Sequence, residues 1–273
     1  MSEGKAPGGR VPPAGANEGG SRVPDAADAP EAPRLLDAGE AGLVVEFGDA
    51  IDEAVNRRVI ALADALEARG LDGVRELVPT YRSLLVMFDP LVLGKARLRD
   101  EIAALWPLGE ARAEEAAPCG VWRVPVLYGG AHGVDLDEVA RRHGLSTDEV
   151  IALHAGATYR VYMIGFAPGF AYLGGLPEAI HTSRRSDPRL KTPPRSISIG
   201  GRQAAVAPPL EIPSGWHLLG QTPVRSYDPA RTARPFLFAA GDALRFEPVS
   251  GGEYEALCRA AEAGEIVAER EGA

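Results

Sequence analysis

The second half of this sequence is divided into short β-favouring segments, each bounded by glycine or proline. TYRVYMIGF, SISIG, RQAAVA, HLLG, PFLFAA and ALRFE follow one another between residues 158 and 247. Many short strands with turn residues between them are typical of sheets that close on themselves. The pattern therefore predicts a closed antiparallel barrel in the C-terminal half.

The first half alternates strand and helix patterns. LLDAGEAGLVVEFG predicts two strands and a turn, and residues 52–69 have helical spacing that Gly70 ends. VRELVP and SLLVMFD predict two further strands, and a second helix is expected over 95–105, before Pro107. VWRVPVLYG, as a returning strand, would complete a split-βαβ unit of ferredoxin-like type. Together the halves predict an α+β protein.

Composition changes place the expected boundaries. Residues 1–33 are rich in small and polar residues and predict a disordered tail. Residues 34–118 form the first lobe, with a hinge over 108–118, and residues 119–250 form the barrel domain with short helices at 135–143 and 147–154. A C-terminal helix is expected within 251–273, with Tyr254, Leu257, Cys258 and Ala261 on one face.

Charge and cysteine content narrow the class of protein. The 273 residues carry a net charge of −9, which disfavours nonspecific nucleic-acid binding. The two cysteines are too few for a disulfide framework and lack metal-ligand spacing. No apolar run approaches the roughly 18 residues of a membrane span, and no signal peptide begins the chain. We expect a soluble cytoplasmic protein with no membrane, nucleic-acid or metal partner.

The segment GFAPGFAYLGGLP, residues 165–177, is the strongest candidate for a binding site. Its glycines permit left-handed backbone and close approach, while Phe166, Phe170 and Tyr172 alternate so that at least one ring is exposed. One interpretation is a ligand pocket with an aromatic wall and backbone N–H donors. The alternative, with about equal weight, is a set of barrel corners with core aromatics.

Further polar candidates follow this segment. Six basic residues lie within fifteen positions and suggest an anion clamp, although a solvated basic loop is the blander interpretation: His181, Arg184, Arg185, Arg189, Lys191 and Arg195. Gln203 on a strand would bind an amide or carboxylate, or else face solvent. Trp216 is either a pocket floor or a core anchor. His154 is most simply a histidine at a helix C-terminus.

Several catalytic motifs are absent. The sequence has no GxSxG elbow, no HExxH, no CxxC pair and no phosphate loop ending in Gly-Lys-Ser/Thr. The candidates supply cations, amides and rings, but no evident nucleophile–base pair. This favours a subunit that completes a site with other proteins.

These motifs resemble the carboxyltransferase subdomain C/D family, also called allophanate hydrolase subunit 1. The resemblance rests on GFAPGFAYLGGLP, the arginine-rich segment with its Pro-Arg pair, Gln203 and the GW…GQTP closure. It covers about residues 34–248. The family includes the B subunit of 5-oxoprolinase and a bacterial sporulation-kinase inhibitor. It implies a ferredoxin-like lobe followed by a cyclophilin-like antiparallel β-barrel.

The resemblance also implies a function. The chain would be the B subunit of an ATP-dependent 5-oxoprolinase, inactive alone, acting with a sister carboxyltransferase subdomain A/B subunit and a third, metal-dependent subunit. ATP would act at the level of the complex, with no metal or biotin bound by this chain. Arg185, Arg189 and Gln203 would be catalytic. The substrate would be bound by His154, Phe166, Pro168, Gly169, Phe170, Tyr172 and Trp216.

The chain departs from the family pattern at several positions. They are Ser183, Pro194-Arg195-Ser196, Ala207, Ile212, Ser214 and Gln221. These departures leave two alternatives open: a regulatory module that inhibits a histidine kinase, and the carboxyltransferase half of a biotin-dependent, urea carboxylase-type system. The latter needs a separate biotin carrier, because this chain has no biotinylation site.

Overall fold

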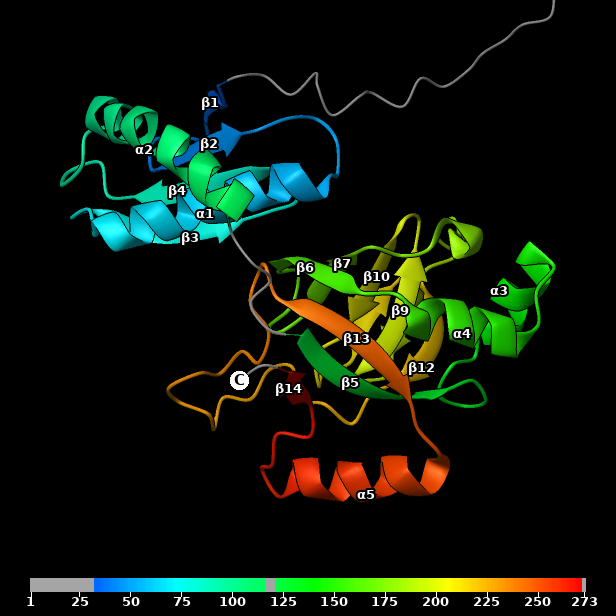
Figure 1. Ribbon diagram of the computed structural model, residues 1–273. Coiled ribbons are helices and arrows are strands. Elements are labelled where there is room, and N and C mark those ends of the chain that lie inside the picture. Colours follow the sequence, from blue (N-terminus) through cyan, green and yellow to red (C-terminus); the bar gives the residue numbers. More distant parts are fainter. Residues whose placement is uncertain (1–31, 116–120, 272–273) are drawn as a thin grey trace, which may run out of the picture.

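The computed structural model describes residues 32–115 and 121–271, which form two lobes (Figure 1). The first lobe combines a sheet with two helices, and the second is a closed barrel with helices outside it. The predicted α+β class is confirmed. Almost all of the expected disordered tail lies outside the described residues, as does the end of the expected hinge, 116–118.

Four antiparallel strands form the sheet of the N-terminal lobe. Their order is β1-β2-β4-β3, with bounds β1 Arg34–Asp37, β2 Gly42–Glu46, β3 Val74–Pro79 and β4 Ser83–Phe88. The prediction that residues 121–129 return to this sheet is wrong, because they form β5, Val121–Tyr128, in the barrel. β1 pairs with β2 through a short hairpin and takes that edge of the sheet, so no returning strand is needed there.

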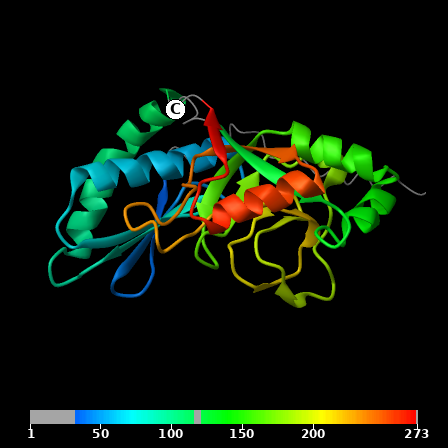
Figure 2. The ribbon, with the colours of Figure 1, turned by 90° about the horizontal axis from the view of Figure 1, so that it is seen from below.

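Two helices pack together on one face of this sheet (Figure 2). α1, Glu53–Arg69, begins at Asp52, whose carboxylate accepts hydrogen bonds from the amides of Ala54 and Val55. It ends at Gly70, whose φ of 59° is easily adopted only without a side chain. The lobe core lies between helices and sheet and includes Leu43, Val59, Leu62, Leu84, Leu98 and Ile102.

The second helix, α2, is longer than the sequence predicts. It runs over Lys95–Glu115 and passes through Pro107, where we expected it to have ended. A proline inside a helix costs about 3 kcal/mol. The following stretch, LGEARAEE, consists almost entirely of strong helix formers, which favour continuation. The expected hinge over 108–118 is therefore mostly helix.

Seven strands close the barrel of the second lobe. Their order is β12-β9-β10-β7-β6-β13-β5, and β5 pairs back with β12. Beyond β5, the bounds are β6 Tyr159–Ile164, β7 Ala171–Gly174, β9 Ser196–Gly200, β10 Gln203–Val206, β12 His217–Gln221 and β13 Ala243–Pro248. At the closure a Cβ on Gly220 would lie 2.6 Å from the Leu127 carbonyl oxygen, so glycine is required there.

The barrel corrects two details of the sequence prediction. β5 and β13 run parallel, so the barrel is not wholly antiparallel. A parallel pair needs a long connection, and most of the lobe lies between these two strands. PFLFAA is expected as a strand, but in the structure Phe236 makes an isolated β-bridge to Tyr227. The next two side chains, Leu237 and Phe238, are buried in the barrel core.

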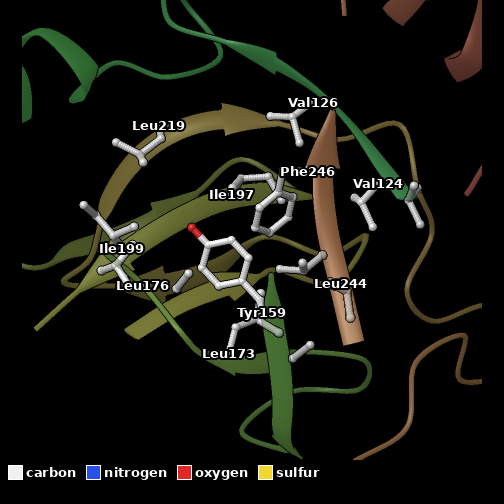
Figure 3. Packing of buried hydrophobic residues seen from close by; sticks show 14 of the residues in the cluster. Val124, Val126, Tyr159, Leu173, Leu176, Ile197, Ile199, Leu219, Leu244 and Phe246 are labelled. Atoms are coloured by element: carbon white, nitrogen blue, oxygen red, sulfur yellow. The ribbon is translucent and has the colours of Figure 1, made fainter. Parts of the chain in front are cut away.

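Apolar side chains fill the barrel interior. Figure 3 shows Tyr159 pointing inward among Leu244, Ile199 and Phe246, all of them buried. The Tyr159 hydroxyl donates to the carbonyl oxygen of His154 at 2.9 Å, so the buried phenol is satisfied. The interior is thus a packed core, and a binding site must lie on the outside of the barrel.

Shorter elements surround the barrel. They are α3 Leu136–His143, α4 Thr147–Gly156, the 3₁₀ turn η2 Glu178–Ile180, the ribbon of β8 Arg189–Thr192 with β11 Ile212–Ser214, α5 Gly251–Glu262, and β14 Glu269–Glu271, which pairs with β5. Ser146 caps α4 in a capping box and Gly144 ends α3, which agrees with the short helices expected at 135–143 and 147–154.

Within the described residues, no helix has the length and apolar character needed to cross a membrane.

Candidate functional site

The tight turn between β6 and β7 projects one aromatic ring away from the barrel. The amide of Ala167 donates to Gly165 O at 2.8 Å, and that of Gly165 donates to Phe170 O at 3.1 Å. Phe166, inside this turn, has a φ of 68°, and the residue is 64% exposed. Left-handed backbone is costly for a bulky residue, and such strain clusters at functional sites. Phe166 is therefore a candidate for contact with a ligand, and this role stays a prediction.

Gly169 holds the turn against a neighbouring loop. It is buried and has a φ of 82°, and a Cβ there would lie 2.6 Å from the Cβ of Tyr227. Only glycine permits this close approach. Gly169 therefore packs the turn against the loop that contains Tyr227, whereas Pro168, two residues after Phe166 in the sequence, is exposed.

Four rings from the barrel continue from this turn into a cluster. The ring centroids of Phe166 and Phe170 are 5.7 Å apart, those of Phe170 and Tyr172 are 4.6 Å apart, and those of Tyr172 and Trp216 are 6.0 Å apart. Phe170 and Trp216 are buried, so the Trp216 ring is a core anchor, and its role as a pocket floor stays a prediction. Gly200 makes room for it, since a Cβ there would lie 2.8 Å from the indole.

A fifth ring comes from the other lobe. Tyr81, in the turn between β3 and β4, contacts Tyr162 edge-on at 5.7 Å and Tyr172 at 5.8 Å. The aromatic cluster, defined as Tyr81, Phe166, Phe170, Tyr172 and Trp216, thus spans both lobes. Sequence analysis did not single out Tyr81, because its only signal is a tyrosine in a turn far from the glycine-rich segment.

Buried Asn56 fixes the two lobes beside this cluster. Its side-chain amide donates to Thr80 O at 3.0 Å in the first lobe and to Tyr162 O at 3.1 Å in the second. Its Oδ1 accepts from Arg160 Nε at 3.3 Å. The turn that carries Tyr81 is therefore held directly against the barrel.

The basic segment that follows divides into different roles. Arg189 donates to both carboxylate oxygens of Asp135, at 2.9 and 2.6 Å, and Arg185 donates to Oδ1 at 3.3 Å. The Leu218 amide donates to Oδ2 at 2.8 Å. In this structure the two arginines predicted to be catalytic are paired with a buried acid, and their direct contact with substrate stays a prediction.

The charge of Asp135 is held by these partners. Burial opposes ionisation, but hydrogen bonds from Arg189 and the Leu218 amide outweigh it and lower the pKa of the carboxyl. Sequence analysis placed Asp135 only at the start of a short expected helix. It does precede α3, but its side chain makes no capping hydrogen bond.

Asp135, Glu138 and His217 bring their possible ligand atoms within 4.8 Å of one another. Nε2 of His217 hydrogen-bonds Ser183 O at 3.0 Å, and Glu138 pairs with Arg142. Both oxygens of Asp135 already accept from guanidinium or amide groups. A metal ion at this position would lie next to the guanidinium groups of Arg185 and Arg189. We therefore infer that these three residues hold the basic segment in place and do not bind a metal.

The remaining predicted residues lie in different surroundings. Gln203 is buried on β10, directly opposite Gly200, the glycine that makes room for the Trp216 ring. His154 is fully buried in the barrel core, where Nδ1 hydrogen-bonds the Tyr128 hydroxyl at 2.7 Å and the ring stacks on Phe246. The structure thus does not bring His154 to the aromatic cluster.

Two departures from the family motif support the loops around α5. Gln221 contacts His132 Nδ1 at 2.5 Å and donates to Pro194 O at 3.0 Å. Arg195 has a φ of 61° and donates to Pro223 O at 3.3 Å. Ala207, by contrast, lies in the small core beneath Phe170 and Trp216, where a tyrosine would need more space.

Arg184 differs from its two neighbours. Its guanidinium lies over the indole of Trp216, 5.4 Å from the ring centroid. Across residues 32–115 and 121–271 it has no hydrogen bond or ion pair to another group, and it is exposed. The cluster therefore presents rings and one unpaired cation.

A two-lobed chain with a closed barrel and an aromatic cluster that spans both lobes defines a structural class. Comparison with known proteins identifies the family. The sequence model of the family described as carboxyltransferase domain, subdomain C and D, matches residues 33–238. The chain belongs to this family.

Among curated relatives, the 5-oxoprolinase B subunit of Bacillus subtilis (strain 168) is 38% identical over 80% of this chain and 93% of its own length. The protein of the same name from Escherichia coli O157:H7 is 39% identical, covering 78% and 95%. That from Haemophilus influenzae is 46% identical over 66% and 83%.

Solved structures agree on the fold. The crystal structure of TTHA0988 matches 77% of this chain at 38% identity with a TM-score of 0.68, and this chain spans 40% of that longer one. The Kluyveromyces lactis urea amidolyase matches 88% with a TM-score of 0.70. At 19% identity this second match supports the fold alone.

Proposed function

We propose that this chain is the B subunit of an ATP-dependent 5-oxoprolinase. The observation that carries the proposal is the 38–46% identity to three relatives of that name, over 83–95% of their lengths. The chemistry agrees with the site. Opening a lactam needs its carbonyl activated, and an aromatic surface with one free cation suits binding of a small ring acid better than unaided hydrolysis.

The proposal assigns only part of the reaction to this chain. ATP is a co-substrate of the whole complex, with a sister subunit and a third subunit as partners. Arg185 and Arg189 position the loop that carries Arg184, by anchoring it to Asp135. If either leaves Asp135 in the complex, its guanidinium becomes available to developing anionic oxygens.

Glutamate release tests the proposal. We expect the chain, co-expressed with its two partner subunits, to release glutamate from 5-oxoproline only when ATP is present. Omitting this chain should abolish release, because the proposal makes this chain a necessary part of the complex. The measurement is glutamate formed per ATP consumed. A complete, folded complex without release contradicts the proposal and favours a regulatory module instead.

A further inference from the structure

One arginine in the segment SRRSDPR pairs with a ring instead of a carboxylate. Arg185 and Arg189 share Asp135, whereas the Arg184 guanidinium rests on Trp216 without any carboxylate among the residues that the structure describes. Stacking on a ring occupies the face of a guanidinium and leaves its edge donors free. Those donors match the two oxygens of a carboxylate.

A second polar group belongs to the aromatic cluster, the hydroxyl of Tyr81. It is buried and, within the described part of the chain, has no hydrogen-bond partner. Burial raises the pKa of both Tyr81 and Tyr172, and the charge of Arg184 acts against this at both phenols. The ring of Tyr81 contacts Tyr172, Tyr172 contacts Trp216, and Arg184 lies over Trp216, so ring contacts connect the hydroxyl to the cation. A buried hydroxyl without a partner costs about 1–3 kcal/mol, which a ligand oxygen would relieve.

The exposed ring of Phe166 bounds this region on the side of the tight turn. It reaches the others through Phe170, which contacts both Tyr172 and Trp216. Rings and a stacked guanidinium are suited to a small, flat, anionic molecule, because the rings bury its faces and the cation binds its charged edge.

We propose that Arg184 binds the carboxylate of the lactam substrate against Trp216, and that Tyr81 of the N-terminal lobe contributes its hydroxyl to the same site. This rests on the proposed function, in which the substrate is 5-oxoproline. Both lobes then build the specificity site. Arg184 selects lactams that carry a carboxylate.

Kinetics of the assembled complex test the role of Arg184. Arg184→Ala should raise KM for 5-oxoproline about 10- to 100-fold, the value of a charge-assisted hydrogen bond, with a smaller change in kcat. Turnover of 2-pyrrolidinone, the same lactam without its carboxylate, should not change. Arg184→Lys should give a KM for 5-oxoproline between those of the wild type and Arg184→Ala. Arg202→Ala removes another exposed arginine and is the matched control.

The possible outcomes separate this inference from the proposed function. An active complex whose KM and preference for 5-oxoproline survive Arg184→Ala overturns the carboxylate role alone. Inorganic phosphate can also be added as a competitor. If Arg184→Ala abolishes inhibition by phosphate but leaves KM for 5-oxoproline unchanged, Arg184 binds phosphate and not the substrate carboxylate, and this too overturns the proposed role. If the wild-type complex is inactive, 5-oxoproline titration followed by tryptophan fluorescence decides: binding lost in Arg184→Ala supports the site, and no binding overturns it.

Tyr81→Phe tests the hydroxyl without removing the ring. We expect KM to rise about fivefold, the value of one neutral hydrogen bond, while Tm stays equal or rises because a buried unsatisfied group is removed. A raised Tm with unchanged KM would assign the hydroxyl to packing alone and overturn its role in binding. Tyr162 contacts the ring of Tyr81 but lies outside the aromatic cluster, so Tyr162→Phe is the control and should leave KM for 5-oxoproline unchanged.

Discussion

Replacing Asp135 with alanine should lower the free energy of unfolding by about 3 kcal/mol, the lower end of the range for breaking a buried ion pair. The carboxylate side chain is 4% exposed, and Arg185 and Arg189 depend on it. Without it, two guanidinium groups that are about three-quarters buried lose their partner. Urea denaturation of the second lobe measures the loss.

A matched control separates this network from general effects of charge. Asp187 is an exposed carboxylate in the same loop, so Asp187→Ala should change stability by less than about 0.5 kcal/mol. Equal denaturation midpoints for the two variants would contradict the anchoring role. Removing Arg189 as well as Asp135 should cost less than the sum of the single changes, because the two share one interaction.

Acid should weaken the same network. The folded pKa of Asp135 lies below its ordinary 3.8, so its stabilisation is present above that value and is lost as pH falls through the lowered folded pKa.

Lowering the pH from 6.5 to 5 should cost about 2 kcal/mol of stability through His154 alone. Burial lowers the pKa of this imidazole from 6.5 to about 3. Between those values the unfolded chain binds a proton that the folded chain does not, so stability falls as pH falls, by about 1.4 kcal/mol per unit. Denaturation at several pH values measures the slope.

Two variants check this assignment. His154→Phe keeps a ring to stack on Phe246 and removes the titrating group, so its stability should fall about 2 kcal/mol less over the same pH interval. Tyr128→Phe removes the hydrogen bond to Nδ1 but keeps the buried imidazole, so it should retain the wild-type slope. Parallel pH profiles for wild type and His154→Phe would refute the claim.

Local signals sufficed for most of the fold. The caps at Asp52, Gly70 and Ser146 and the short strands of the barrel follow from patterns within a few residues. The error in placing β5 arose where distant pairing decides the outcome, whereas the early end predicted for α2 overestimated the local effect of Pro107. The residues of β5 favour a strand, but nothing in them distinguishes pairing with β13 and β12 from pairing with the first sheet.

For the candidate site, the sequence indicated which kinds of residue take part, but not how they are arranged in space. The rings of the glycine-rich segment do contact Trp216, which fits both interpretations of that segment, so its role in binding stays a prediction. Sequence analysis named Arg185 and Arg189 as catalytic but could not foresee that both pair with Asp135, because Asp135 lies about 50 residues earlier. Tyr81 was missed for the same reason, since only the packing of the lobes brings it near.

The pairing of β5 has a consequence for the order of events during synthesis. This strand leaves the ribosome early, yet its partners β12, β13 and β14 all come from the last 60 or so residues of the chain. The N-terminal lobe has every strand of its sheet before β5 is made, so it can fold while translation continues. The barrel must wait with an apolar strand unpaired, a state prone to aggregation. Slow translation before residue 217 should therefore lower the yield of folded protein more than slowing within the first lobe.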